Sequence, residues 1–313
     1  MEKDEMKLLV KIAQMYYQED KNQSQISKEL NIHRSTISRL LKQSRMQGIV
    51  TISINYDKAG TYSLEEELKK KFQLIGAVVV PMASEIDDEQ RMNLLGKAAN
   101  DYVHTILEDG MIVGFSWGRA MAAFARSLKD FHLKDITCVP MVGGPAGRLE
   151  SDFHVNTITY EASKNIHGRA LLIDAPAFPE TVSLKKALME NDFNQKLIEY
   201  WRKLDVAIFG IGSPSLKKSS RWKNFYGDDV FEFVEENEVV GDIVSRFFDK
   251  DGNHISSQLD DRLVGIDITE LKRAHFRICL VDSVEKTEAV KGALKGGYIN
   301  ILVLTQEIAE QLL

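Results

Sequence analysis

The chain has 313 residues, of which 44% are hydrophobic and 27% are charged, and its net charge is −6 at pH 7. This composition excludes bulk disorder, and the length suffices for a large core and for two domains. No apolar run approaches the roughly 20 residues that span a bilayer, and no signal peptide is recognisable, so we expect a cytoplasmic protein without membrane contact. Cys138 and Cys279 lie in apolar, strand-like segments and are expected to be buried, reduced thiols.

The first residues predict three helices. Apolar side chains recur with a helical period over residues 8–16. We expect Ser24 to cap a second, short helix, and Asn31 to hold the sharp turn after it, because asparagine tolerates a positive φ. A third helix is expected to begin near Ser35. Five apolar positions across the last two helices fit a helix-turn-helix: Ile26, Leu30, Ile32, Ile37 and Leu40.

Residues 21–56 contain six basic residues and one acidic residue, so this segment carries +5 and the rest of the chain −11. A compact basic segment on an acidic body favours a polyanionic partner. The third helix offers donors that suit base edges and phosphates in the major groove of double-stranded DNA. They are Arg34, Ser35, Thr36, Ser38, Arg39 and Lys42. Residues 48–56 alternate like a strand and predict a wing, although a basic helical hairpin with a solvated face is the alternative for the whole segment.

From about residue 62 the pattern changes to a charged helix over residues 63–74 and then to alternating strands and helices. The alternation predicts an α/β domain in which a parallel sheet carries helices on both faces. Expected strands lie at residues 76–81, 111–115, 136–142, 169–174, 204–212, 276–282 and 299–304. The expected domains are a (winged) helix-turn-helix at 1–56, a helical linker at 57–73 and an effector-binding domain at 74–313. Residues 213–240 are predicted to form a long loop or lid.

Four polar or glycine-rich turns follow predicted strands, at residues 114–119, 142–147, 210–215 and 240–246. Ligands of such sheets bind at the carboxyl ends of the strands, where the amides of a glycine turn can bind phosphate. The first turn also matches G-x-S-x-G, the pattern around a serine-hydrolase nucleophile. Because no oxyanion loop precedes it, we expect Ser116 to donate its hydroxyl to a bound anion; a purely structural turn is the alternative.

These segments resemble a known family. YYQEDKNQSQISKELNIHRSTISRLLKQSRMQGIV is similar to the DNA-binding head of SorC-type bacterial sugar-responsive regulators. FSWGRA, GGP, DVAIFGIGSP, GDIVSRFFDKDGN and KGALKGGYIN resemble their effector domain, so the resemblance covers essentially the whole chain. It is strongest to regulators of sorbose or sorbitol operons. It implies an effector domain that is related to sugar-phosphate isomerases but acts as a receptor, and assembly into a homo-oligomer, either a dimer or a tetramer.

The same resemblance implies a set of effector-binding residues: Ser116, Trp117, Gly118, Arg119, Gly143, Gly144, Gly212, Asp242 and Lys286. These residue types suit a phosphosugar, since Lys286 and Arg119 supply positive charge to a phosphate and Asp242 accepts hydrogen bonds from hydroxyls. Trp117 either stacks on a sugar or fills the core. Asp242 and Lys286 either bind the effector or form an ion pair with each other.

The sequence therefore predicts a transcriptional regulator of a carbohydrate-utilisation operon, whose binding to operator DNA is controlled by a sugar or phosphosugar. No catalytic residue, metal or cofactor is expected. The alternative is a sugar-phosphate isomerase or serine hydrolase that carries a DNA-binding head, which would need a general base facing the pocket.

Overall fold

The computed structural model of the chain describes residues 3–50, 56–82, 86–145, 151–214, 233–234 and 236–313. The chain divides into two compact units, Met1–Ala59 and Gly60–Leu313, which we call the head and the body. Helix α4 (Tyr56–Phe72) spans the boundary between them. The domain limits inferred from the sequence stay a prediction.

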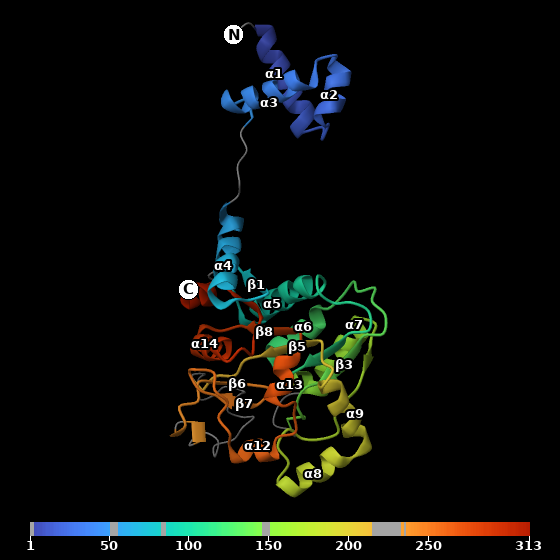
Figure 1. The fold of residues 1–313 in the computed structure, drawn as a ribbon, viewed down its shortest axis with the longest axis vertical. Coiled ribbons are helices and arrows are strands. Elements are labelled where there is room, and N and C mark those ends of the chain that lie inside the picture. Colours follow the sequence, from blue (N-terminus) through green and yellow to red (C-terminus); the bar gives the residue numbers. More distant parts are fainter. Residues whose placement is uncertain (1–2, 51–55, 83–85, 146–150, 215–232, 235) are drawn as a thin grey trace. The chain divides into compact units, whose positions relative to one another are not determined.

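The head is built from helices α1 (Lys3–Tyr17), α2 (Gln23–Leu30) and α3 (Arg34–Met46) (Figure 1). They enclose a small core of buried apolar side chains: Leu9, Ile12, Met15, Ile26, Ile37, Leu40 and Leu41. The three helices predicted from the amphipathic pattern are therefore confirmed. The predicted wing falls mostly on residues 51–55, which lie outside the described residues.

Within the described residues, the body contains a seven-stranded parallel sheet in the order β1-β9-β8-β5-β2-β3-β4. Its strands are β1 (Gly76–Val80), β2 (Ile112–Phe115), β3 (Thr137–Pro140), β4 (Arg169–Ala170), β5 (Val206–Gly210), β8 (Phe276–Val281) and β9 (Ile301–Thr305). The predicted parallel sheet is confirmed. From β2 the chain moves outward to β3 and β4, whereas from β5 it moves the opposite way to β8 and β9, so the connections diverge between β2 and β5.

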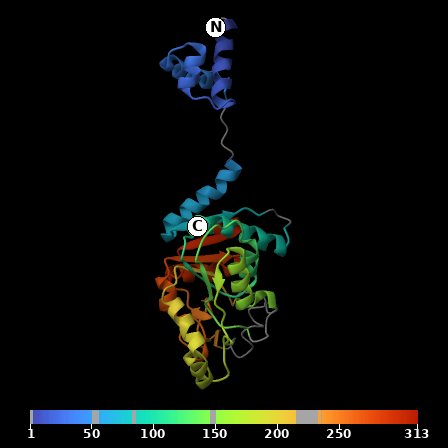
Figure 2. The ribbon, with the colours of Figure 1, turned by 90° about the vertical axis from the view of Figure 1, so that its right-hand side faces the viewer.

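Helices lie on both sides of this sheet (Figure 2), and a layer of buried hydrophobic side chains covers each of its faces. Along β9, Ile301 and Val303 enter one layer and Leu302 and Leu304 the other, because successive strand side chains alternate. The first layer is formed mainly with α5 (Asp88–Val103), α6 (Arg119–Ser127) and α7 (Val155–Asn165). The second is formed mainly with α9 (Asp192–Trp201), α14 (Thr287–Lys295) and α15 (Gln306–Leu312). The predicted helices on both faces are confirmed.

The body also holds elements that the sequence analysis missed. Helix α8 (Val182–Glu190) precedes α9, and the antiparallel pair β6 (Gly241–Ile243) and β7 (Arg246–Phe248) replaces an expected polar turn. Two short helices follow this pair, α12 (Gln258–Arg262) and α13 (Ile268–Arg273). The strand expected over residues 169–174 is shorter, since β4 ends at Ala170. Most of the predicted loop or lid at 213–240 lies outside the described residues.

Cys138 and Cys279 are free and buried, as predicted. They belong to different hydrophobic layers, so the sheet itself separates them. Burial raises the pKa of each thiol to about 12. Both therefore remain protonated near neutral pH and act as small apolar side chains of the core.

Candidate functional site

The turn between α2 and α3 is fixed by hydrogen bonds within the head. Asn31 adopts the left-handed conformation, with φ 52° and ψ 42°, and its amide donates to the carbonyl of Ser27. The hydroxyl of Ser27 donates to the carbonyl of Ile32 at 2.6 Å. The prediction for Asn31 is confirmed, and the turn sets the angle at which α3 leaves α2.

The cap of α2 is Asn22, so the prediction of Ser24 as the cap is wrong. The Asn22 side chain accepts hydrogen bonds from the amides of Ser24 and Gln25 at 3.1 and 3.0 Å. In return, the Gln25 side chain accepts from the Asn22 amide at 2.8 Å, which completes a capping box. Asparagine caps helices as well as serine does, and only the position of the first helical turn decides between them.

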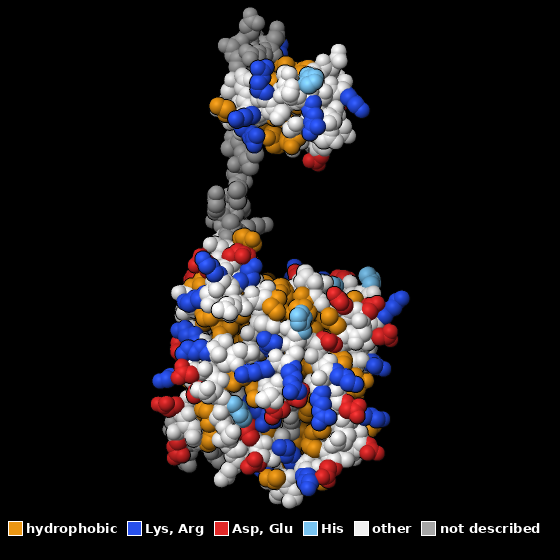
Figure 3. Space-filling view, viewed as in Figure 1, with side chains coloured by type: hydrophobic (Ala, Val, Ile, Leu, Met, Phe, Trp, Pro, Cys, Tyr) orange, Lys and Arg blue, Asp and Glu red, His pale blue; other side chains and the backbone are white. Residues whose placement is uncertain are grey.

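Helix α3 presents the predicted DNA-binding residues on one side, which we call the recognition face: Arg34, Ser35, Thr36, Ser38, Arg39 and Lys42. All are exposed except Thr36, which is half-buried, whereas Ile37 and Leu40 on the opposite side are buried. His33 stands at the cap position of α3 without a capping hydrogen bond from its side chain, and its Nδ1 lies 2.8 Å from the Ser35 hydroxyl, a contact that the sequence analysis missed. Basic side chains stand out on the visible surface of the head in Figure 3. An exposed polar and basic face opposite a buried apolar one is what a helix that enters the major groove requires, and the role of these six residues stays a prediction.

In the body, the divergence of the chain between β2 and β5 defines where a ligand binds in an open parallel sheet. Strand β2 is followed directly by Ser116, which is 4% exposed, and β5 ends at Gly210. The Ser116 hydroxyl accepts a long hydrogen bond from the Gly210 amide and donates to the Trp117 carbonyl, both at 3.4 Å. Ser116 therefore lies at the carboxyl edge of the sheet, as expected, and its role in effector binding stays a prediction.

The G-x-S-x-G pattern has a structural explanation. A Cβ on Gly114 would lie 2.8 Å from Sδ of Met141, so the packing of the Met141 side chain against β2 favours glycine at this position. The positive φ of this turn, 119°, belongs to Gly118 and not to Ser116. A nucleophile elbow holds its serine in a strained turn, and here the partners of the Ser116 hydroxyl are backbone groups.

Gly118 precedes α6, whose first-turn amides have no acceptor within the helix. A Cβ on Gly118 would meet no atom of the described residues within 4 Å, so these residues leave room beside the start of the helix. The Gly118 amide donates to the carbonyl of Phe153 at 3.3 Å, which brings the 3-10 turn η1 (Ser151–Phe153) beside it. The positive end of the α6 dipole favours an anion at this point.

The amides of Gly143 and Gly144 are engaged elsewhere. They donate to the carbonyls of Val264 and Ala175 at 2.8 and 2.9 Å. The prediction that these amides face a bound anion is therefore wrong, although their place beside the pocket stays a prediction. A Cβ on Gly144 would lie 2.5 Å from Nε2 of His154, so the glycine makes room for that ring.

His154 is a candidate that the sequence analysis did not single out. Its Nδ1 accepts a hydrogen bond from the Asn156 amide at 3.1 Å, which places the ring proton on Nε2. Burial lowers the pKa of His154, so the neutral ring is favoured. Its Nε2–H is a donor next to Gly144, and the preceding residue contacts Gly118. No spacing in the sequence could have shown this proximity.

Asp242 reaches the end of β5 through the β6–β7 pair. Asp242 and Gly212 exchange two backbone hydrogen bonds, at 3.0 and 3.2 Å. The Asp242 carboxylate accepts from the amide of Ser245 at 3.2 Å and is 4% exposed. The turn that joins β6 to β7 places Val244 and Ser245 at φ 48° and 66°, which is unusual for a β-branched residue. Two predicted residues far apart in sequence are thus brought together, and the amide of Gly212 faces Asp242 instead of a ligand.

Lys286 ends the 3-10 turn η2 (Val284–Lys286), which begins a few residues after β8, and its Nζ donates to Oδ1 of Asp282 at 2.5 Å. Both side chains are largely buried, at 13% and 16% exposed. The ion pair of Lys286 is therefore with Asp282, and the alternative of a pair with Asp242 is wrong. Burial alone would raise the pKa of Asp282, but the charges of Lys286 and Arg119 hold it below its ordinary value. Two predicted cations thus act on one carboxylate.

Arg119 and Trp117 flank the same turn. Arg119 is the first residue of α6 and pairs with Asp88 at 3.3 Å, and Asp88 also pairs with Arg91 at 3.4 Å. Arg91 is a further cation that the sequence analysis missed. Trp117 is half-buried and packs against the second hydrophobic layer, so part of its ring fills the core.

A helix-turn-helix head on a sheet domain with an anion-suited edge defines a ligand-responsive transcriptional regulator. A family model described as "Putative sugar-binding domain" matches residues 56–313. The sorbitol operon regulator of Klebsiella pneumoniae is 41% identical over 311 residues, which cover 99% of this chain and 98% of the relative. The crystal structure of full-length SorC from that organism superimposes with a TM-score of 0.79 at 40% identity, over 98% of both chains. The chain belongs to the SorC-type family of sugar-binding transcriptional regulators.

A more distant relative, the deoxyribonucleoside regulator of Bacillus subtilis, is 28% identical over 312 residues, covering 100% of this chain and 99% of the relative. These relatives are regulators and not enzymes, and the same holds for this chain. The prediction of a transcriptional regulator that answers to a sugar, with DNA and a sugar effector as partners, is thereby confirmed. Among the described helices, none is long and apolar enough to cross a membrane.

Proposed function

We propose that this protein controls an operon for a six-carbon sugar or sugar alcohol, and that its effector is a phosphorylated form of that compound. The likeness to a sorbitol operon regulator supports the substrate class. The observation that carries the proposal is the gathering of charge beside the open end of α6. Lys286 and Arg119 both act on Asp282 there, and Ser116 directly follows the adjacent strand.

In this proposal the phosphate binds the first-turn amides of α6 and the hydroxyl of Ser116, with Lys286 as the nearby cation. A helix N-terminus with a neighbouring cation is a common phosphate site in α/β sheets. The Asp242 carboxylate accepts from sugar hydroxyls, and the Nε2–H of His154 donates to them. Three of the effector residues predicted from the sequence, Ser116, Asp242 and Lys286, thus act together at the junction of β2, β5 and β8.

The recognition face of α3 reads the operator in the same proposal. Arg39 contacts a base and Lys42 a phosphate, because arginine suits bidentate base recognition and lysine acts as a point charge. One such helix contacts few base pairs, so two heads bind two half-sites of a pseudo-palindrome, as a dimer or a tetramer. A regulator that binds the chromosome of a bacterium works in the cytoplasm.

Titration calorimetry with D-glucitol 6-phosphate and the full chain tests the effector proposal. We expect Ser116→Ala to weaken binding about ten- to hundredfold, since one hydrogen bond to a charged acceptor is worth roughly 1.5–3 kcal/mol. Ser63→Ala on α4, whose hydroxyl contacts Glu67, is the matched control and should bind as the wild type does. Unchanged affinity in Ser116→Ala would contradict the proposed site. Stoichiometric labelling of Ser116 by an organophosphate probe would instead support the hydrolase.

A further inference from the structure

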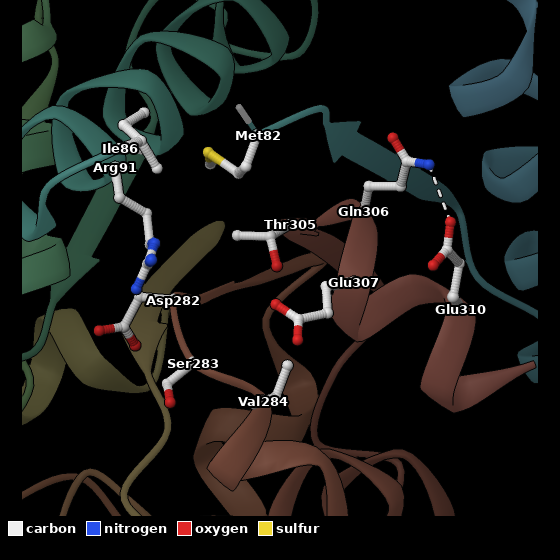
Figure 4. A pocket seen from close by; sticks show the side chains of 10 residues that line it. All are labelled: Met82, Ile86, Arg91, Asp282, Ser283, Val284, Thr305, Gln306, Glu307 and Glu310. Carbon is white, nitrogen blue, oxygen red and sulfur yellow. Dashed lines mark hydrogen bonds between the residues drawn. The ribbon is translucent and has the colours of Figure 1, made fainter. Parts of the chain in front are cut away.

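A cavity opens at the carboxyl ends of β1, β9 and β8, with a volume of about 460 Å³ (Figure 4). Its described lining includes none of the residues predicted to bind the effector. It comes from the segment after β1, the start of α5, the loop after β8 and the start of α15. The candidate effector site lies instead around the ends of β2, β5 and β8, so the two sites are neighbours at the end of β8. The cavity therefore needs an explanation of its own.

Thr305 points into this cavity (Figure 4). It is the last residue of β9, is 4% exposed and stands at the cap position of α15, yet its hydroxyl makes no cap hydrogen bond. That hydroxyl has no hydrogen-bond partner among the described residues. Because this hydroxyl lines the cavity, it can donate one hydrogen bond to a molecule bound there and can also accept one.

The remaining lining combines polar groups with an apolar wall. Met82 and Ile86 supply the wall, and the carboxylates of Asp282 and Glu307 face the same space as the guanidinium of Arg91 (Figure 4). A polyhydroxylated molecule matches this mixture, because its C–H groups pack on apolar side chains while its hydroxyls donate to carboxylates and accept from a guanidinium. The volume lies within the range of small-molecule sites.

The charge of the lining selects against a phosphate. The described lining contains one cation, Arg91, and three carboxylates, those of Asp282, Glu307 and Glu310. Lys286 neutralises the charge of Asp282 through its ion pair, but it does not pair with Glu307 or Glu310. An excess of negative charge therefore remains, which repels a phosphate dianion and accepts a neutral polyol.

We propose that this cavity is a second ligand site, which takes an unphosphorylated sugar or sugar alcohol. The site is coupled to the effector site through Asp282, whose carboxylate lines the cavity and also pairs with Lys286. A polyol hydroxyl that binds Asp282 changes how firmly Lys286 is held, so each ligand alters the affinity for the other to the same extent. The coupling, though not the cavity, rests on the proposed role of Lys286.

Ligand-observed NMR titrations of the full chain with D-glucitol test the site, with D-mannitol and xylitol as further probes. We expect Thr305→Val, which keeps the shape of the side chain, to weaken D-glucitol binding about three- to tenfold by removing one hydrogen bond. Glu307→Gln, at an exposed residue that does not hold the fold, should weaken it at least as much. The matched control is Glu288→Gln on the exposed side of α14, which should leave binding unchanged.

Two comparisons separate this site from the effector site. Ser116→Ala should reduce binding of D-glucitol 6-phosphate but leave D-glucitol binding unchanged, and Thr305→Val should do the reverse. Saturating D-glucitol should shift the affinity for the phosphosugar in the wild type. Failure of the phosphosugar alone to bind would overturn the proposed function and leave the cavity assignment standing.

Three results would overturn the cavity assignment. The first is that none of the three polyols binds the wild type. The second is that D-glucitol binding survives both Thr305→Val and Glu307→Gln, or is lost in Ser116→Ala. The third is that putrescine, and not D-glucitol, binds in a way that depends on Glu307, which would make the cavity a site for cations.

Discussion

The head and the body present their functional side chains in different ways. In the head, all six residues of the recognition face lie between Arg34 and Lys42 on the single helix α3. In the body, the candidate effector residues range from Ser116 to Lys286 and meet because β2, β5 and β8 are neighbours in the sheet. A helical period therefore suffices to place the first set, whereas the second set depends on the strand order of the whole domain. The predictions below test whether the two regions are as independent as this difference implies.

The largest effect is expected from Ile37→Ala in the head. Ile37 is fully buried in a core of few residues, and such a truncation costs about 2–5 kcal/mol. A domain of this size has little stability to lose, so operator binding should fail in a fluorescence-anisotropy titration. Thermal unfolding followed by tryptophan fluorescence should not change, because all three tryptophans lie in the body. Met46→Ala is the control, since that side chain is 79% exposed. A lower midpoint of thermal unfolding of the body in Ile37→Ala would contradict the independence of head and body.

The next effect concerns the acid stability of the body. Burial alone would raise the pKa of Asp260, but hydrogen bonds from His254 and Arg246 hold it at about 2. Because this pKa lies below that of the unfolded chain, the stabilisation is present above about pH 4 and is lost as the pH falls toward 2.

Asp260→Asn should therefore lower the free energy of unfolding of the body by about 2–3 kcal/mol at pH 7, and by little near pH 2. Denaturant unfolding across this pH range, followed by tryptophan fluorescence, measures the difference. Asp261→Asn is the neighbouring control on α12. A penalty that stays constant down to pH 2 would show that the ionised carboxylate is not its source.

Lys286→Met tests the link between the two regions through the effector. The change removes the charge and keeps much of the length of the side chain, so effector affinity should fall by about 1.5–3 kcal/mol, or ten- to hundredfold. Operator affinity without effector should stay the same, and the operon should no longer respond to its inducer. Lys291→Met is the control, because Lys291 pairs with Glu288 on the exposed side of α14. Weaker operator binding by Lys286→Met in the absence of effector would mean that the residue supports the head directly.

Arg39→Ala addresses the head alone. If Arg39 contacts a base, its loss costs roughly 1–3 kcal/mol and relaxes the preference at one operator position. Lys42→Ala should instead weaken all sequences alike and reduce the salt dependence of binding, as expected for a phosphate contact. Gel-shift titrations over an operator library distinguish the two. If Arg39→Ala and Lys42→Ala both weakened binding equally for every operator sequence, Arg39 would make no base contact.

The same contrast explains what could be predicted from the sequence. The period of apolar residues gave the helices of the head, and β-branched runs gave the strands of the sheet, because both signals are local. The position of Ser116 and Gly118 between a strand and a helix could be predicted, because a strand that ends in a glycine turn has a recognisable sequence. The partners of the site were not found. The pairing of Lys286 with Asp282, the position of His154 beside Gly144, and the engaged amides of the glycine turns are all tertiary contacts.

The β6–β7 pair shows a second limit. Its turn holds Val244 and Ser245 at positive φ, where glycine, asparagine or aspartate is usual. For that reason the sequence predicts a loop and not a hairpin over this segment. The surrounding structure must stabilise this turn, and only the complete fold contains those contacts. Even in the head, a local rule chose the wrong one of two neighbouring capping residues.

The smallest effect tests that cap. Asn22→Ala removes the acceptor for two amides of the first turn of α2 and one half of the capping box, so the head should lose about 1 kcal/mol, within a range of roughly 0.5–2. Ser24→Ala should change the stability by less, because the structure gives Ser24 a place inside the helix, where alanine is the better helix former. The loss is too small to abolish operator binding. It is best measured by following the anisotropy of labelled operator as the temperature rises, since unfolding of the head releases the operator. Since α2 supports the turn before α3, the Asn22 variant should release operator at a lower temperature than the wild type, and the Ser24 variant should not. The opposite order would restore Ser24 as the cap and place the start of α2 where the sequence first suggested it.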